Sequence, residues 1–138
     1  MASRSDVELL EGLLELEHRL ISAYEAALRR DAIDPALGEL LRDQEETHVR
    51  GLLRALRGGR RSPRASVPAT ELTAALRGPA AFARYALKTE AETVAAYRLA
   101  VAQISDPELR QALGSILACE AAHEVALRDS LGERLVVD

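Results

Sequence analysis

Apolar residues recur every three or four positions over four long stretches of the chain, and short breaks rich in Gly, Pro and Asp separate them. This spacing is typical of amphipathic helices. We predict helices over residues 6–30, 35–57, 79–104 and 107–131. Asp34-Pro35 and Asp106-Pro107 each provide a helix cap followed by a proline suited to the first turn. The pattern therefore predicts an all-α fold built from two tight helical hairpins.

Residues 58–78 join the two predicted hairpins and are too long for a simple turn. They begin with Gly, Pro, Ser and Arg, and a short helical segment is expected near residues 70–77. About a dozen extended residues reach roughly 40 Å, whereas a helix of about 24 residues is roughly 36 Å long. The segment is thus predicted to be a crossover connection within one domain, residues 1–138, since a chain of this size has room for a single core.

The composition supports this helical reading and excludes some partners. Only 3% of residues are aromatic and 48% are hydrophobic, with Ala, Leu, Arg and Glu prominent, which favours helix over strand. A net charge of -4 argues against nucleic-acid binding, which needs a positive field. We find no uncharged stretch that could span a membrane and no apolar leader, so we expect a cytoplasmic protein without nucleic-acid or membrane partners.

The motif Glu-x-x-His occurs three times, and two of the copies interrupt an apolar stripe. Glu45 with His48 and Glu120 with His123 lie in the middle of the second and fourth predicted helices. Residues three apart in a helix differ by about 60° around the axis and 4.5 Å along it, so each pair could hold one ion. The third copy, which begins at Glu15, lies in a polar stripe, and we assign it to the surface.

Two further acids stand alone on apolar helix faces, Glu17 in the first helix and Glu90 in the third. An internal repeat relates them, because Glu90 and Tyr97 follow Glu17 and Tyr24 by 73 residues. Such a repeat predicts a pseudo-two-fold axis, and all these positions lie at similar distances from the hairpin turns. We therefore predict that six side chains meet at one level of the core: Glu17, Glu45, His48, Glu90, Glu120 and His123.

Several buried carboxylates need positive partners, because an isolated buried charge is strongly disfavoured. Four glutamates would balance two divalent cations if the histidines are neutral, and carboxylate with imidazole suits iron, manganese or zinc. Tyr24 and Tyr97 could donate hydrogen bonds to the ligand carboxylates, the alternative being plain core packing. Cys119, the only cysteine, is expected to be a small buried apolar residue.

The order Glu, Glu-x-x-His, Glu, Glu-x-x-His resembles that of the ferritin-like di-iron carboxylate proteins, in particular the small rubrerythrin-related bacterial domains. The resemblance covers nearly the whole chain and implies a four-helix bundle holding two iron ions, with Glu45 and Glu120 as bridges. It also implies redox activity toward oxygen or peroxide. Two alternatives remain open: a ferroxidase that handles ferrous iron in a larger oligomer, and a metal-free helical interaction module. A homodimer is expected, since two-fold dimers are the commonest oligomers.

Overall fold

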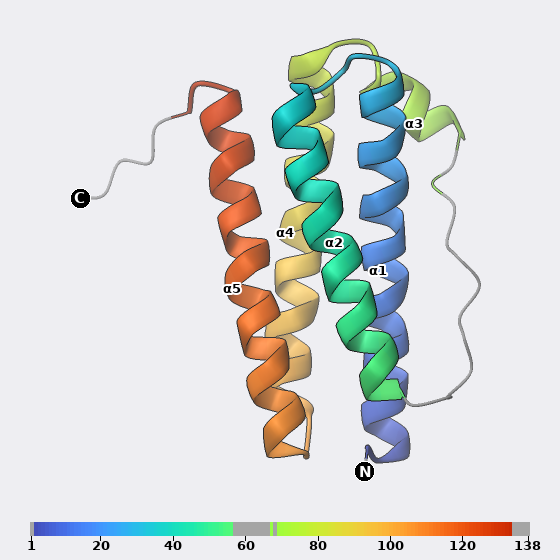
Figure 1. The fold of residues 1–138 in the computed structure, drawn as a ribbon, viewed down its shortest axis with the longest axis vertical. Coiled ribbons are helices and arrows are strands. Elements are labelled where there is room, and N and C mark those ends of the chain that lie inside the picture. Colours follow the sequence, from blue (N-terminus) through green and yellow to red (C-terminus); the bar gives the residue numbers. More distant parts are fainter. Residues whose placement is uncertain (1, 57–66, 68, 134–138) are drawn as a thin grey trace.

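The computed structural model describes residues 2–56, 67 and 69–133, and its elements are helices (Figure 1). All four predicted helices are present, and each begins and ends within two residues of its predicted bounds. The prediction of an all-α fold is confirmed. The elements in chain order are α1 (Arg4–Arg29), α2 (Pro35–Leu56), α3 (Ala69–Ala75), α4 (Pro79–Gln103) and α5 (Pro107–Ser130).

The two hairpin turns lie at opposite ends of the bundle (Figure 1). The α1–α2 turn is at the end where α4 begins, and the α4–α5 turn is at the end where α1 begins. The end of α2 and the start of α3 therefore lie toward opposite ends of the bundle, as the crossover prediction requires. Residues 57–66 and 68 of this connection lie outside the described part, and the short helix expected near 70–77 is α3, which packs against α4.

Side-chain caps explain where three of the four long helices begin, namely α1, α2 and α5. The Asp106 side chain accepts from two backbone N–H groups at the start of α5, and Asp34 accepts the backbone N–H of Leu37 at 3.0 Å. Ser3 caps α1 in a reciprocal arrangement with Asp6. Asp6 also accepts from the hydroxyl of Ser105 at 2.8 Å, which ties the first turn of α1 to the α4–α5 turn.

The core consists of two apolar layers on either side of a buried polar layer. On each long helix a ligand candidate separates the two layers; on α1, for example, Glu17 lies between Leu14 and Leu20. Such burial of apolar area is the main source of stability of a bundle. The layer at the start of α1 includes Leu10, Leu13, Leu14, Leu52, Ile104 and Leu113, and the layer at the α1–α2 turn includes Leu20, Tyr24, Leu41, Phe82 and Leu127.

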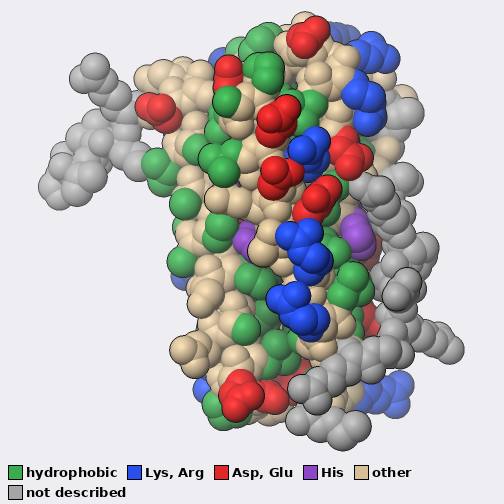
Figure 2. All heavy atoms as spheres, viewed as in Figure 1, with side chains coloured by type: hydrophobic (Ala, Val, Ile, Leu, Met, Phe, Trp, Pro, Cys, Tyr) green, Lys and Arg blue, Asp and Glu red, His purple; other side chains and the backbone are tan. Residues whose placement is uncertain are grey.

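The outer face of the bundle differs from its polar middle layer. Acidic and basic side chains are intermixed along α2, down the middle of the face shown in Figure 2. By contrast, the four glutamates of the middle layer are 0% exposed. None of the described helices is both long and apolar enough to cross a membrane.

Candidate metal centre

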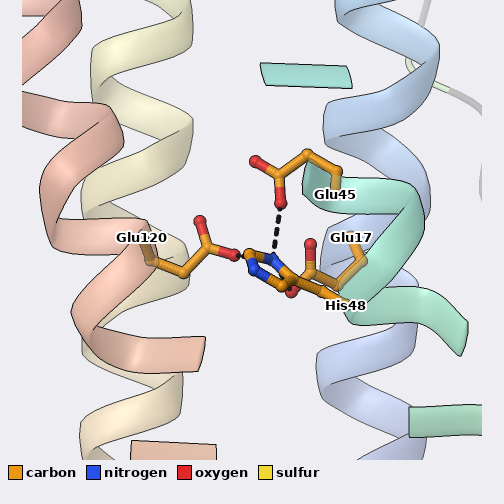
Figure 3. Close-up of side chains that lie close together, drawn as sticks. All are labelled: Glu17, Glu45, His48 and Glu120. Atoms are coloured by element: carbon orange, nitrogen blue, oxygen red, sulfur yellow. Dashed lines mark hydrogen bonds and ion pairs between the residues drawn. The ribbon is translucent and has the colours of Figure 1, made fainter. Parts of the chain in front are cut away.

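The six side chains singled out by the sequence meet inside the bundle, halfway along it. All are buried, including the two histidines, which are 6% and 2% exposed. In Figure 3, Glu17 from α1 and Glu120 from α5 are turned toward His48 of α2, next to Glu45. The cluster comprises Glu17, Glu45, His48, Glu90, Glu120 and His123.

His48 directs Nδ1 into the cluster. This atom lies 2.8 Å from Oε1 of Glu120, 3.0 Å from Oε2 of Glu45 and 3.5 Å from Oε1 of Glu17. Because the three carboxylates come from three different helices, the contacts join α1, α2 and α5 around one imidazole.

His123 directs its own Nδ1 toward the same middle point from α5. Its distances are 3.0 Å to Oε1 of Glu45, 3.3 Å to Oε2 of Glu120 and 3.4 Å to Oε1 of Glu90. Glu45 and Glu120 thus offer one oxygen to each histidine. Glu17 with His48 lies on one side of these two carboxylates, and Glu90 with His123 lies on the other.

These spacings are those of atoms that bind a common ion. Two ligand atoms about 2.1 Å from one cation are about 3.0–3.4 Å apart at octahedral or tetrahedral angles. Two overlapping sets of ligand atoms lie within 4.8 Å of one another: Glu17, Glu45, His48 and Glu120 in one, and Glu45, Glu90, Glu120 and His123 in the other. The arrangement can therefore accommodate two adjacent ions that share two carboxylates.

Several of the converging atoms lack hydrogen-bond partners, although they are buried. Within the described part of the chain these include both oxygens of Glu120, one oxygen each of Glu17, Glu45 and Glu90, and Nδ1 of His123. An unsatisfied buried polar atom costs about 1–3 kcal/mol, and more when it is charged. Cations held by the two overlapping sets of ligands would supply partners to buried atoms of this kind, so the residues fit a metal centre.

The surroundings of the cluster raise the pKa values of both histidines and of Glu90. Burial disfavours the charged imidazolium of His48, but its close contacts with the carboxylates of Glu120, Glu17 and Glu45 outweigh this effect and raise its pKa to about 12. The same balance raises the pKa of His123. Burial also raises the pKa of Glu90 to about 7. Protons on the two histidines therefore neutralise part of the negative charge that cations would otherwise neutralise.

A family model described as a ferritin-like domain matches residues 5–133. The chain belongs to the ferritin-like family. No curated protein and no solved structure matches it. In this ferritin-like protein, the buried carboxylate and histidine groups form a cluster that could hold metal ions.

Two tyrosines of the ferritin-like protein hydrogen-bond the cluster from opposite hairpins. Tyr24 on α1 donates its hydroxyl to Oε1 of Glu90 on α4, and Tyr97 on α4 donates to Oε1 of Glu17 on α1. Burial and the nearby carboxylates raise the pKa of both hydroxyls, so they stay protonated donors. The two bonds obey the pseudo-two-fold relation of the repeat and cross-link the hairpins.

The third Glu-x-x-His pair lies outside the cluster. Glu15 is exposed, as predicted, whereas His18 is half-buried rather than fully on the surface. The reason is helical phase: His18 follows the buried Glu17 directly, so it is only about 100° away from the core-facing direction.

Sequence reasoning missed two residues beside the cluster, Gln44 and Cys119. Nε2 of His123 lies 2.7 Å from Oε1 of Gln44 and 3.4 Å from Sγ of Cys119. Cys119 is half-buried and polar in its contacts, which corrects the expectation of a small buried apolar residue. A signal was available: each residue directly precedes the glutamate of a Glu-x-x-His pair, and the 75-residue offset that relates Glu45 to Glu120 relates Gln44 to Cys119.

Proposed function

We propose that this ferritin-like protein binds two metal ions, iron in its native setting, and uses them in redox chemistry with oxygen or peroxide. The observation that carries the proposal is the position of Glu45 and Glu120, each of which offers one oxygen toward either histidine. Two shared carboxylates between two imidazoles are suited to a pair of ions.

Charge balance supports the same proposal. Four carboxylates carry four negative charges, which two divalent cations and neutral imidazoles would cancel within a dry interior. Mixed oxygen and nitrogen ligands suit iron and manganese, and also zinc. Membership of the ferritin-like family favours iron among these.

The protein's own residues would bind the ions, orient them and keep water out. The glutamates and the Nδ1 atoms of His48 and His123 are the proposed ligands. Tyr24 and Tyr97 hold protons against two of the carboxylates, and the apolar layers above and below exclude solvent. When bound, two ferrous ions would supply two electrons, which with two protons can reduce one peroxide to two waters.

Iron handling is the second candidate, because a ferroxidase would use the same residues. In that case ferrous iron is the substrate, and the protein works in an assembly larger than the homodimer that we propose for the redox enzyme. A metal-free interaction module is disfavoured, since it would leave the buried carboxylate oxygens without partners.

Metal analysis followed by oxidation distinguishes these candidates. Protein purified without chelator should contain about two metal equivalents, and metal-free protein should take up two ferrous ions without oxygen. On addition of oxygen or peroxide, the redox enzyme should oxidise two iron ions per chain and then stop unless a reductant is supplied. Continued oxidation of added ferrous iron by a large assembly would favour iron handling, and a folded protein that binds no metal would refute both.

A further inference from the structure

The two histidines of the cluster differ at the nitrogen that faces away from it. Nε2 of His123 lies 2.7 Å from Oε1 of Gln44, a residue of α2 in the opposite hairpin. The hydrogen bonds and ion pairs that the described residues make with His48 all run through its Nδ1. One imidazole is therefore held on both sides, and the other on its inner side.

The Gln44 contact settles which nitrogen of His123 is available to a cation. An amide oxygen can only accept a hydrogen bond, so Nε2 must carry the proton and donate it. Nδ1, which faces three glutamates, is then the nitrogen that a metal ion would bind. In metal sites, the partner of the outer nitrogen fixes both the tautomer and the orientation of the ring, and strengthens the ligand.

The two halves of the internal repeat differ at the position of Gln44. The 75-residue offset that relates His48 to His123 places Cys119 where the other half has Gln44. A thiol accepts hydrogen bonds only weakly, whereas an amide oxygen accepts them well. Cys119 itself contacts His123 and Gln44, at 3.4 Å and 3.8 Å, so it adds to the surroundings of His123.

We propose that Gln44 is a positioning residue for His123 and that it makes the two metal positions unequal. The ion held by Glu90 and His123 binds more tightly than the ion held by Glu17 and His48. The inference rests on the proposed function in that it requires metal binding at the cluster. Loss of such an outer partner typically weakens metal binding by about 10- to 100-fold, which sets the expected difference.

Titration of metal-free protein with zinc, a redox-silent probe, tests the inequality by calorimetry. Wild-type protein should bind two ions in two steps whose dissociation constants differ by about tenfold or more. Gln44→Met keeps the size of the side chain but removes the acceptor, so the tighter step should weaken by about 10- to 100-fold while the weaker step is unchanged. Gln44→Glu, which restores an acceptor oxygen, should restore the tighter step. Gln111→Met, the same change at an exposed position of α5, should bind like wild type.

Nuclear magnetic resonance of the imidazole nitrogens gives a readout that a merely structural role would not change. In zinc-loaded wild-type protein, the Nε2 proton of His123 should exchange with solvent more slowly than that of His48. Gln44→Met should speed the exchange at His123 alone. This wild-type comparison remains decisive even if Gln44→Met does not fold.

Two equal dissociation constants in the wild type, or two unchanged constants in folded Gln44→Met, would overturn the role of Gln44. Equal exchange of the two Nε2 protons would do the same. These results would leave the proposed dinuclear function intact. Folded protein that binds no zinc in any variant would instead overturn the proposed function and this inference together.

Discussion

Helices α1 and α5 supply equivalent parts of one centre but are buried very differently. Helix α1 buries eleven residues, nine of them apolar, including five Leu or Ile side chains. Helix α5 buries four, Leu113, Glu120, His123 and Leu127, so half of its buried residues belong to the cluster. Equivalent motifs therefore need not have equivalent support: apolar packing holds α1, whereas α5 depends on the polar layer.

The largest expected effect concerns the two shared carboxylates, where the halves should behave alike. Either Glu45→Ala or Glu120→Ala should abolish binding of a metal pair, because each removes an oxygen from both ligand sets. Metal analysis of purified variants measures this. Glu15→Ala, which alters the exposed glutamate of the third Glu-x-x-His pair, should keep two equivalents. Two equivalents in Glu45→Ala or Glu120→Ala would show that the ligands are wrongly assigned.

Metal removal should loosen α5 more than α1. An ion present at 100 times its dissociation constant stabilises the folded state by about 2.7 kcal/mol. On chelation, amide hydrogens in the middle of α5 should exchange at least about tenfold faster, while those near Leu10 to Leu14 of α1 change little, since apolar neighbours hold them. Hydrogen exchange with and without metal makes the measurement. Equal loosening of the two helices would contradict their unequal dependence on the polar layer.

The pH dependence of stability should change sign with metal. In metal-free protein, His48 (pKa about 12 against 6.5) and Glu90 (about 7 against 4.5) hold protons that the unfolded chain releases. The folded state then binds more protons, so its free energy of unfolding falls as pH rises from about 5 to 8, by up to about 1.4 kcal/mol per pH unit for each proton retained.

Metal reverses this slope, because cations replace protons on the ligands and bind more tightly as pH rises. Urea denaturation at pH 5.5, 6.5 and 8, with chelator and with excess zinc, measures how the free energy of unfolding depends on pH in each case. An increase in the stability of metal-free protein as pH rises over this range would contradict the proposed protonation of the cluster.

The smallest expected effect on metal content is that of the paired tyrosines. Tyr24→Phe and Tyr97→Phe should each keep two metal equivalents, because neither hydroxyl is a proposed ligand. Each should lower the free energy of unfolding by about 1.5–3 kcal/mol, the usual contribution of a hydrogen bond to a charged group. Similar losses for the two variants are expected from their equivalent bonds. A variant that lost metal would show that its hydroxyl contributes to binding directly.

Helices and convergence of the six side chains could be predicted from the sequence because local rules decide them. Helical period places Glu17 and Glu90 on apolar faces, and distance from the turns sets their level. The contact of Gln44 with His123 could not be predicted, since it depends on how closely α2 approaches α5. In the sequence, Gln44 differs from an outer-face residue only by its place next to Glu45.

The different depths to which the apolar residues of α5 are buried also could not be predicted from the sequence. Leu109 and Ile116 lie on the same apolar stripe of this helix as the buried Leu113. The structure leaves both half-buried, packed at the margin of the apolar layer near the α4–α5 turn. The period of a stripe gives its direction, but the depth of each residue depends on the neighbouring helices.

The crossed tyrosine bonds make each hairpin depend on the other. A single hairpin in isolation would keep a carboxylate without its donor and a hydroxyl without its acceptor, whereas two identical hairpins related by a dyad would satisfy both. The chain has the arrangement expected of two such subunits fused end to end. Joining the two halves in one chain makes their assembly independent of concentration, and it allows equivalent positions to differ, as Gln44 and Cys119 do.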